Sequence, residues 1–302
     1  MSRLRLVQPP GRQGPGPTPQ TAVAALDLAI ARRTAGRLPG EHISAGVGLG
    51  TELAQIRPYV VGDDLRQIDP AASARTNELH VRQHVPERAL TTWLLLDVSP
   101  SMAFGTADRL KSDVAAGAAT VISRLSTRRG GRIAVLRWGA GREVVLPPRA
   151  GRRGMGAVDR LINEGVGADG TNAEGDLAHG IGRLGLLARL PGLVVIVSDF
   201  RDDSHWVRPM GLLAQRHRVV ACEISDPREE RLPDAGTILV RDPESGAEVE
   251  LNTGSKELRA AYERAARARR DQLETGLKRL GVRHIPLSTS RDWLRDLGAG
   301  LR

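Results

Sequence analysis

The chain has 302 residues, of which 40% are hydrophobic, 3% are aromatic and 26% are charged, and its formal net charge is +9. The hydrophobic fraction is sufficient for a core, which must be built from Leu, Val, Ile and Ala because aromatic residues are so few. Cys222 is the single cysteine, which excludes an intramolecular disulfide and a cysteine-based zinc site. No stretch approaches the run of about 18 apolar residues that a membrane span requires, so we expect a cytoplasmic protein without a membrane segment.

The positive charge comes almost entirely from arginine, since only three of the 44 basic residues are lysines. A basic surface favours acidic protein partners or nucleic acid. Proteins that bind single strands stack the bases on aromatic side chains, whereas the four Trp, two Tyr and two Phe of this chain are scattered. Nucleic-acid binding is therefore a minor hypothesis.

Two kinds of segment precede the main sheet. Residues 1–20 are rich in Pro, Gly and Gln, a composition typical of a disordered tail. Residues 21–37 follow a helical pattern, whereas the charged run 57–66 has a weak helical period, which favours short strands and turns. We interpret the acidic and basic side chains of that run as a structural ion-pair network or a domain contact. A helix and a small β-rich appendage are therefore predicted over residues 21–88.

From residue 89 to the carboxyl end, apolar strands alternate with helices. The expected strands are 90–98, 132–138 paired with 143–146, 193–197, 219–224, a hairpin of 237–240 with 248–251, and 282–287. The expected helices are 108–127, 155–163, 173–188, 206–216, 255–280 and a final helix for which Thr289 and Asp292 resemble a capping box. This alternation predicts an α/β domain with a doubly wound, mostly parallel sheet over residues 89–302.

The first of these strands ends in the pattern D-x-S-x-S. If the chain stays extended, Asp97, Ser99 and Ser101 point the same way, because side chains two residues apart share a face. Three small oxygen ligands without His or Cys suit a hard cation such as Mg²⁺. The alternative interpretation is a strand followed by an ordinary Ser-Pro turn.

Two further residues are expected at the same edge of the sheet. In the common strand order 3-2-1-4-5-6 the first and fourth strands are neighbours, and ligands gather at their carboxyl ends. Asp199 directly follows the fourth strand, so we expect it beside the D-x-S-x-S turn, at a sheet end that faces solvent. Thr171 precedes the helix that leads into that strand, where it is either another hydroxyl ligand or the N-cap of the helix.

Together these residues resemble the metal-ion-dependent adhesion site of von Willebrand factor type A domains. The resemblance implies that Ser99, Ser101 and Thr171 are hydroxyl ligands of Mg²⁺ or Mn²⁺, and that Asp97 and Asp199 are the acids, which often act through water. Such an ion keeps an open coordination position that a carboxylate of a partner protein can fill. The site would then serve adhesion rather than catalysis.

Longer blocks resemble the bacterial family called domain of unknown function 58, from about residue 46 to the carboxyl end. They are RPYVVGDDLRQIDPAASARTNELHV, LDVSPSMAFG, and VVIVSDF followed by the DPRE and LPD segments. The chain departs from the family at Pro70, where Trp is usual. The resemblance implies a MoxR-type AAA+ ATPase as the partner and a role in assembling or remodelling other proteins. Many members carry amino-terminal membrane helices, which we do not expect here.

We therefore expect a Mg²⁺-dependent protein-interaction module, an adaptor or co-chaperone of a MoxR-type ATPase, without enzymatic activity. One alternative is a metal-dependent hydrolase. Phospho-aspartate chemistry is disfavoured because Ser99 stands where a second Asp is needed, and nothing fixes His205 toward Ser99 as part of a hydrolytic triad. The other alternative is a module with an empty metal site whose basic surface binds anions or nucleic acid.

Overall fold

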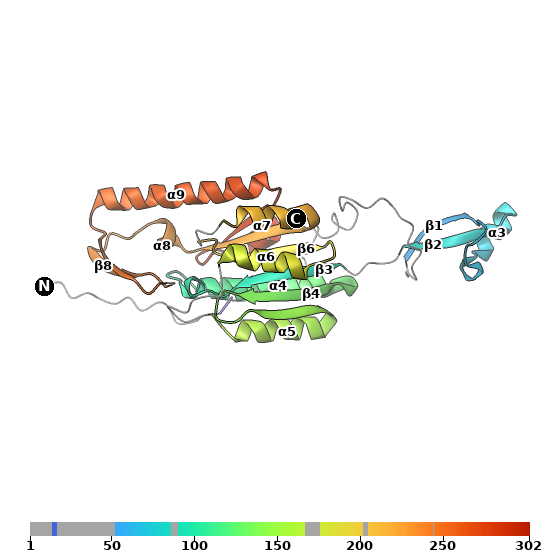
Figure 1. Cartoon of the computed structure of the whole chain (residues 1–302), viewed down its shortest axis with the longest axis horizontal. Coiled ribbons are helices and arrows are strands. Elements are labelled where there is room, and N and C mark those ends of the chain that lie inside the picture. Colours follow the sequence, from blue (N-terminus) through green and yellow to red (C-terminus); the bar gives the residue numbers. More distant parts are fainter. Residues whose placement is uncertain (1–13, 17–51, 86–89, 167–175, 202–204, 244) are drawn as a thin grey trace. The chain divides into compact units, whose positions relative to one another are not determined.

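The computed structural model describes residues 14–16, 52–85, 90–166, 176–201, 205–243 and 245–302 (Figure 1). The chain divides into two compact units, Pro39–Ala89 and the remainder, and each is described by itself. The predicted helix over 21–37 and the predicted domain boundaries at 20/21 and 88/89 lie outside the described residues, so they stay predictions.

The smaller unit contains short strands, as expected of a β-rich appendage, and they pair antiparallel. Its elements are β1 (Glu52–Pro58), the 3-10 helix η1 (Leu65–Gln67), α3 (Pro70–Thr76) and β2 (His80–Val85). Helix α3 was not predicted. It forms because the Asp69 side chain accepts a hydrogen bond from the backbone N–H of Ala72 at 2.9 Å, and because Pro70 suits the first helical position.

Charged side chains of the smaller unit stabilise its turns. Arg57 donates two hydrogen bonds of 2.7 Å to the Asp63 carboxylate, which also accepts the backbone N–H of Val60. The guanidinium and that N–H hold the pKa of Asp63 below its ordinary value. The interpretation of this run as a structural ion-pair network is therefore supported at Arg57 and Asp63.

The larger unit is built on one six-stranded sheet. Its strands, from one edge to the other, are β10 (Arg283–Ser288), β7 (Arg218–Ser225), β6 (Leu193–Ser198), β3 (Thr91–Asp97), β4 (Arg132–Trp138) and β5 (Val144–Ala150). All neighbours pair in parallel except β4 and β5, which are antiparallel. Numbered along the chain, the order is 3-2-1-4-5-6, so the predicted doubly wound sheet is confirmed and β3 lies beside β6.

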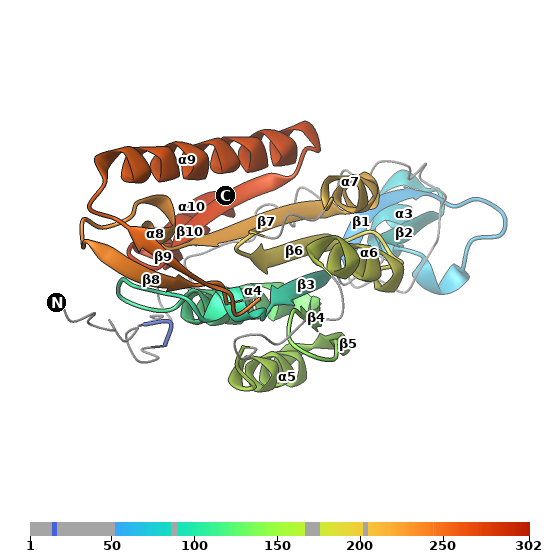
Figure 2. The same cartoon turned by 60° about the vertical axis from the view of Figure 1, so that its left-hand side comes forward.

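Helices cover both faces of this sheet (Figures 1 and 2). One core joins Leu94 and Leu96 to α4 (Lys111–Thr127), α5 (Gly151–Asn163) and α10 (Trp293–Gly300). The other joins Trp93 and Leu95 to α6 (Leu177–Leu187), α7 (Val207–Arg216) and α9 (Lys256–Arg279). Successive residues of β3 therefore enter opposite cores, which explains why Trp93–Leu96 is a continuous apolar run.

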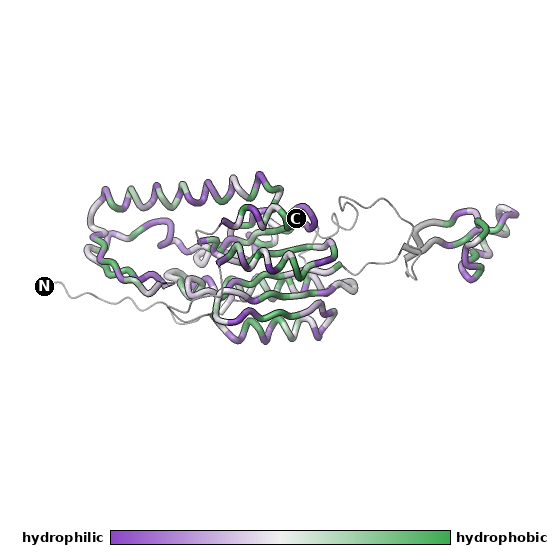
Figure 3. Tube along the Cα trace, viewed as in Figure 1, coloured by the Kyte–Doolittle hydropathy of each residue, from purple (hydrophilic) through white to green (hydrophobic). Residues whose placement is uncertain are grey.

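A hairpin follows β7 and the short helix α8 (Pro227–Glu230). Its strands are β8 (Thr237–Arg241) and β9 (Glu248–Asn252), which confirms the predicted hairpin. The hairpin lies at the carboxyl end of the parallel strands (Figures 1 and 2). Figure 3 shows that hydrophilic residues dominate the long helix α9 that comes next. Within the described part of the chain, every helix is too short or too polar to cross a membrane.

The beginnings of two helices differ from the prediction. Helix α5 begins at Gly151, four residues earlier than expected. The proposed capping box of the last helix is wrong. Asp292 itself is the N-cap and accepts the backbone N–H of Arg295 at 3.0 Å, whereas the Thr289 hydroxyl donates to Asp226 at 2.7 Å.

Candidate metal centre

Four of the five predicted ligands come together where β3 and β6 end. Asp97 is the last residue of β3, Ser99 and Ser101 lie in the turn that follows, and Asp199 comes directly after β6. The Oγ atoms of Ser99 and Ser101 are 3.1 Å apart. Thr171 lies outside the described residues, so its predicted role stays untested.

The backbone around these residues is shaped by a close approach of β4. Val98 donates its N–H to the carbonyl of Trp138 at 2.7 Å, and Gly139 follows with a φ of +107°. A Cβ atom at Gly139 would lie 2.6 Å from the backbone nitrogen of Ser99 and 2.8 Å from Oδ1 of Asp97. A residue with a side chain there would therefore push the D-x-S-x-S turn away from the sheet.

The expectation that these groups face solvent is wrong. Asp97, Ser99 and Asp199 are only 4%, 7% and 6% exposed. The sequence predicts where the strands end, but it does not predict that these side chains are buried there. Buried carboxylates need hydrogen bonds or a counter-charge, since desolvation disfavours their ionised form.

Within the described ranges Asp97 has hydrogen-bond donors but forms no ion pair with a basic side chain. Its Oδ1 accepts the backbone N–H of Ser99 at 2.9 Å, and its Oδ2 accepts the hydroxyl of Ser198 at 2.6 Å. Burial, followed by the negative charge of Asp199, raises the pKa of Asp97 to about 6, although hydrogen bonds from Ser198 and Ser99 act against this. A bound cation at this position would relieve the repulsion between the two acids.

Asp199 has a lysine as its counter-charge, and the sequence analysis missed that residue. The Nζ of Lys111, at the start of α4, lies 2.6 Å from Oδ2 of Asp199 and 2.7 Å from Oε1 of Glu229. The Lys111 side chain is fully buried. Burial alone would raise the pKa of Asp199, but the charge of Lys111 and its hydrogen bond outweigh burial and hold that pKa below its ordinary value.

A signal for Lys111 was present in the sequence. Lysine is rare in this chain, and Lys111 stands at helical spacing from Ala115, Ala118 and Ile122, which all face the core. A charged residue in line with an apolar face is seldom buried without a partner. That pattern points to an internal ion pair, although it does not identify the two acids.

The second acid, Glu229, is fixed by a network around Asp226. Glu229 accepts the backbone N–H of Asp226 at 3.0 Å. The Asp226 carboxylate accepts the hydroxyl and backbone N–H of Thr106 at 2.6 and 2.8 Å and the hydroxyl of Thr289 at 2.7 Å. This network ties together α8, the loop before α4 and the residue after β10, and so it fixes Glu229, one of the two acids paired with Lys111.

The residues present fit a hard divalent cation. Adjacent ligands at about 2.1 Å from an octahedral Mg²⁺ lie about 3.0 Å apart, close to the 3.1 Å between the Ser99 and Ser101 hydroxyls. No group of three His, Cys, Asp or Glu side chains in the described ranges could hold a metal ion. A cation at this position would therefore depend on the hydroxyls, as the D-x-S-x-S pattern predicted, with both carboxylates as neighbouring acids.

Comparison with known proteins finds relatives over most of the chain. The model of the family described as "Protein of unknown function DUF58" matches residues 55–272. The chain belongs to this family. Uncharacterized protein Rv1480 of Mycobacterium tuberculosis is 37% identical over 276 residues, which cover 91% of this chain and 86% of that protein. Uncharacterized protein MAV169 of Mycobacterium avium is 36% identical over 152 residues, covering 50% of this chain and 89% of that protein.

Several solved structures are similar in part. An aerotolerance-related membrane protein from Bacteroides fragilis has 11% identity and a TM-score of 0.44, covering 70% of this chain and 98% of that one. BatB from Bacteroides thetaiotaomicron has 13% identity and a TM-score of 0.43, covering 70% and 97%. The SpRpn10 VWA domain has 12% identity and a TM-score of 0.38, covering 69% and 93%. Because these TM-scores are below 0.5, the fold of this DUF58 protein is assigned from its strand order and not from these structures.

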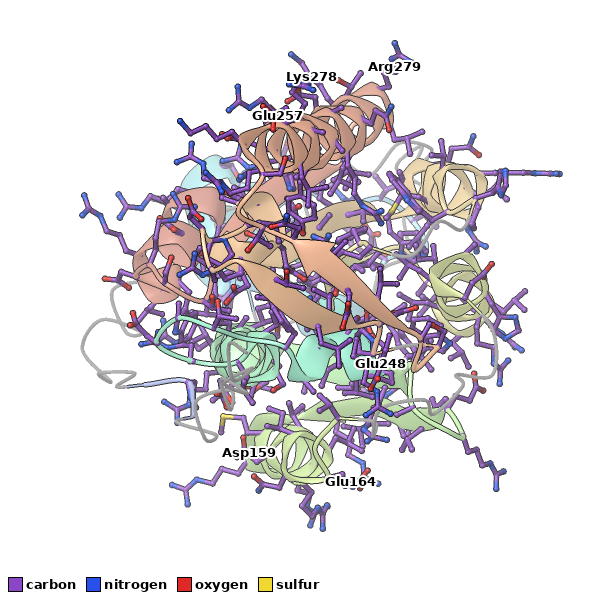
Figure 4. The ribbon with its side chains drawn as sticks, turned by 90° about the vertical axis from the view of Figure 1, so that its left-hand side faces the viewer. Asp159, Glu164, Glu248, Glu257, Lys278 and Arg279 are labelled. Carbon is purple, nitrogen blue, oxygen red and sulfur yellow. The ribbon has the colours of Figure 1, made fainter. Side chains whose placement is uncertain are left out.

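Replacing Lys111 by Met should destabilise the protein strongly, because Asp199 and Glu229 would then be buried without their common cation. Breaking a buried ion pair from one side costs roughly 3–5 kcal/mol. Urea unfolding of Lys111→Met at pH 7 should show a loss of this order, whereas Lys278→Met, at an exposed position labelled in Figure 4, should unfold like the wild type. Equal stability of Lys111→Met and wild type would contradict the assigned role.

Asp97→Asn should stabilise the metal-free protein at neutral pH. The folded-state pKa of Asp97 is about 6, above its ordinary value of 3.8, so its ionised form costs stability at pH 7 and this cost disappears as the pH falls toward 4. Unfolding in chelator should show a gain of about 1–3 kcal/mol at pH 7 and little gain near pH 4. A variant less stable than wild type at pH 7 would contradict this prediction, because the ionised Asp97 carboxylate would then not destabilise the folded state.

Proposed function

We propose that this DUF58 protein is a Mg²⁺-dependent protein-interaction module. The observation that carries the proposal is the pair of serine hydroxyls, 3.1 Å apart, beside two buried carboxylates at the carboxyl ends of adjacent parallel strands. Ser99, Ser101 and Thr171 would hold the ion through hydroxyls, and Asp97 and Asp199 would act through water. When bound, the ion supplies an open coordination position that attracts an anionic ligand.

Lys111 restricts what the site can bind. It balances part of the charge of Asp199 and Glu229, so a cation at the hydroxyls would be incompletely neutralised by the protein. A carboxylate presented by a partner would complete that neutralisation. We therefore propose that the partner contributes an Asp or Glu, and that the arginine-rich surface of the chain steers an acidic partner toward the site.

The family resemblance supports a MoxR-type AAA+ ATPase, or a protein on which it acts, as that partner. The chain would then serve as an adaptor or co-chaperone in protein assembly or remodelling, in the cytoplasm. This identification of the partner comes from the resemblance of the sequence blocks alone, whereas the chemistry of the partner comes from the site.

Hydrolysis is the second candidate function. The pKa of about 6 at Asp97 would suit a general base beside the hydroxyls. A bound divalent cation would, however, lower that pKa, and Lys111 keeps the neighbouring Asp199 ionised and poorly basic. We therefore propose no independent catalytic activity. Metal-dependent turnover of phosphate esters, carboxylic esters or peptides that is lost in Ser99→Ala would favour the hydrolase instead.

The third candidate is a module whose metal site is empty. The Lys111 ammonium already supplies a positive charge beside Asp199, which favours this alternative to a limited extent. Such a protein would be indifferent to metal, and its basic surface would bind anions or nucleic acid in the presence of chelator.

Calorimetric titration with Mg²⁺ or Mn²⁺ should show one site that Asp97→Ala abolishes while the protein stays folded. Affinity should fall about tenfold per pH unit below pH 6, because protons compete for the Asp97 carboxylate. Asp159→Ala is the matched control, since this exposed acid lies on α5 (Figure 4). Equal binding by wild type and Asp97→Ala would refute the metal site.

Binding of a purified MoxR-type ATPase, measured by surface plasmon resonance, should weaken with chelator, with Asp199→Ala, and with neutralisation of one acid on the ATPase. Its association rate should also fall as salt rises, since the surplus of arginine attracts an acidic surface. Asp159→Ala should leave both the affinity and the association rate unchanged. Should the complex form equally well after all three changes, the contact lies elsewhere on the chain.

A further inference from the structure

A short amino-terminal segment, Gly14-Pro15-Gly16, contacts the larger unit far from its place in the sequence. The indole Nε1–H of Trp293 donates a hydrogen bond of 2.9 Å to the carbonyl oxygen of Pro15. Trp293 is the first residue of α10 and is 2% exposed. Figures 2 and 4 show the segment as a short blue stretch beside α4.

Gly117 gives this contact its space. It lies within α4 between four alanines, at positions 115, 116, 118 and 119, where another alanine would favour the helix by about 1 kcal/mol. A Cβ atom at Gly117 would lie 2.5 Å from Cζ2 of Trp293 and 2.8 Å from Cβ of Pro15. The helix therefore has a glycine where the indole of Trp293 and the ring of Pro15 both pack against its backbone.

Arg109 borders the same surface. A Cβ atom at Gly16 would lie 3.3 Å from a guanidinium nitrogen of Arg109, so this side chain lies close against the segment backbone. Arg109 precedes Lys111 by two residues and belongs to the loop that joins the metal-site hydroxyls to α4. The segment therefore contacts the loop that links the candidate metal centre to α4.

The chemistry of this surface is that of proline recognition. An indole N–H directed at a backbone carbonyl, with a proline ring against a glycine of the helix, suits a proline in a bend. Gly14 and Gly16 supply that bend, with φ values of +71° and +76° that side chains rarely adopt. The sequence around the segment, RQGPGPTPQ, has proline at every second position from Pro15 to Pro19.

We propose that Trp293, Gly117 and Arg109 form a binding site for a Gly-Pro-Gly bend, and that residues 14–16 of the same chain are its ligand in cis. The tether gives that ligand an effective concentration of about 1 mM. A proline-containing peptide in trans therefore competes only at comparable concentration, or when the cis segment is released.

The indole N–H signals of the ¹⁵N-labelled full-length chain test the proposal, with Trp293→Phe assigning the Trp293 signal. Pro15→Asp introduces a charge against the apolar surface. It should shift that signal and raise the hydrogen-exchange rate of the Trp293 Nε1–H at least tenfold. Pro19→Asp, the matched control outside the described residues, should change neither.

Adding the peptide PPGRQGPGPTPQ, residues 9–20, to the Pro15→Asp protein should restore the wild-type shift and slow exchange. The same peptide should bind the wild type more weakly, because the cis segment competes. Identical exchange in wild type and Pro15→Asp would overturn the cis contact. Failure of the peptide to bind Pro15→Asp at about 5 mM, several times the expected effective concentration, would overturn the assignment of the surface as a proline site.

Discussion

The buried ammonium of Lys111 is the interaction on which the rest of the centre depends. It joins the start of α4 to Asp199, 88 residues later in the chain, and to Glu229, 118 residues later. The sheet brings β3 and β6 together through apolar burial, but burial alone would disfavour two ionised acids at their ends. Lys111 compensates the charge of Asp199. The Asp226 network fixes the position of Glu229, the second acid paired with Lys111.

The two acids of the centre consequently differ. Asp199 is ionised and held by an internal cation, whereas Asp97 is desolvated, repelled by Asp199 and close to protonation at neutral pH. The chain thus carries an unbalanced negative charge beside two hydroxyls that are already at a suitable separation. An external cation would balance Asp97 as Lys111 balances Asp199. On this account a bound metal ion would relieve the repulsion between Asp97 and Asp199. A carboxylate of a partner protein would then be attracted by the positive charge of that ion.

Much of this arrangement could be predicted because it follows from local patterns. The D-x-S-x-S spacing placed Asp97, Ser99 and Ser101 together after the first strand. The common order of doubly wound sheets placed Asp199, after the fourth strand, at the same edge. The Lys111, Glu229 and Asp226 network could not be predicted in the same way, because its contacts join positions about a hundred residues apart. For the same reason Thr289, which locally resembles a helix cap, turned out to hydrogen-bond Asp226. Local spacing identifies ligands that share a strand or turn, but not the counter-charges that other elements bring.

The most direct test of the account is a crystal of the protein soaked in Mn²⁺, with anomalous scattering measured at the manganese edge. The account predicts one strong peak within direct coordination distance of the Ser99 and Ser101 hydroxyls, with Lys111 still paired to Asp199 and Glu229. A peak elsewhere, no peak at saturating Mn²⁺, or a manganese ion that displaces Lys111 from Asp199 would contradict it.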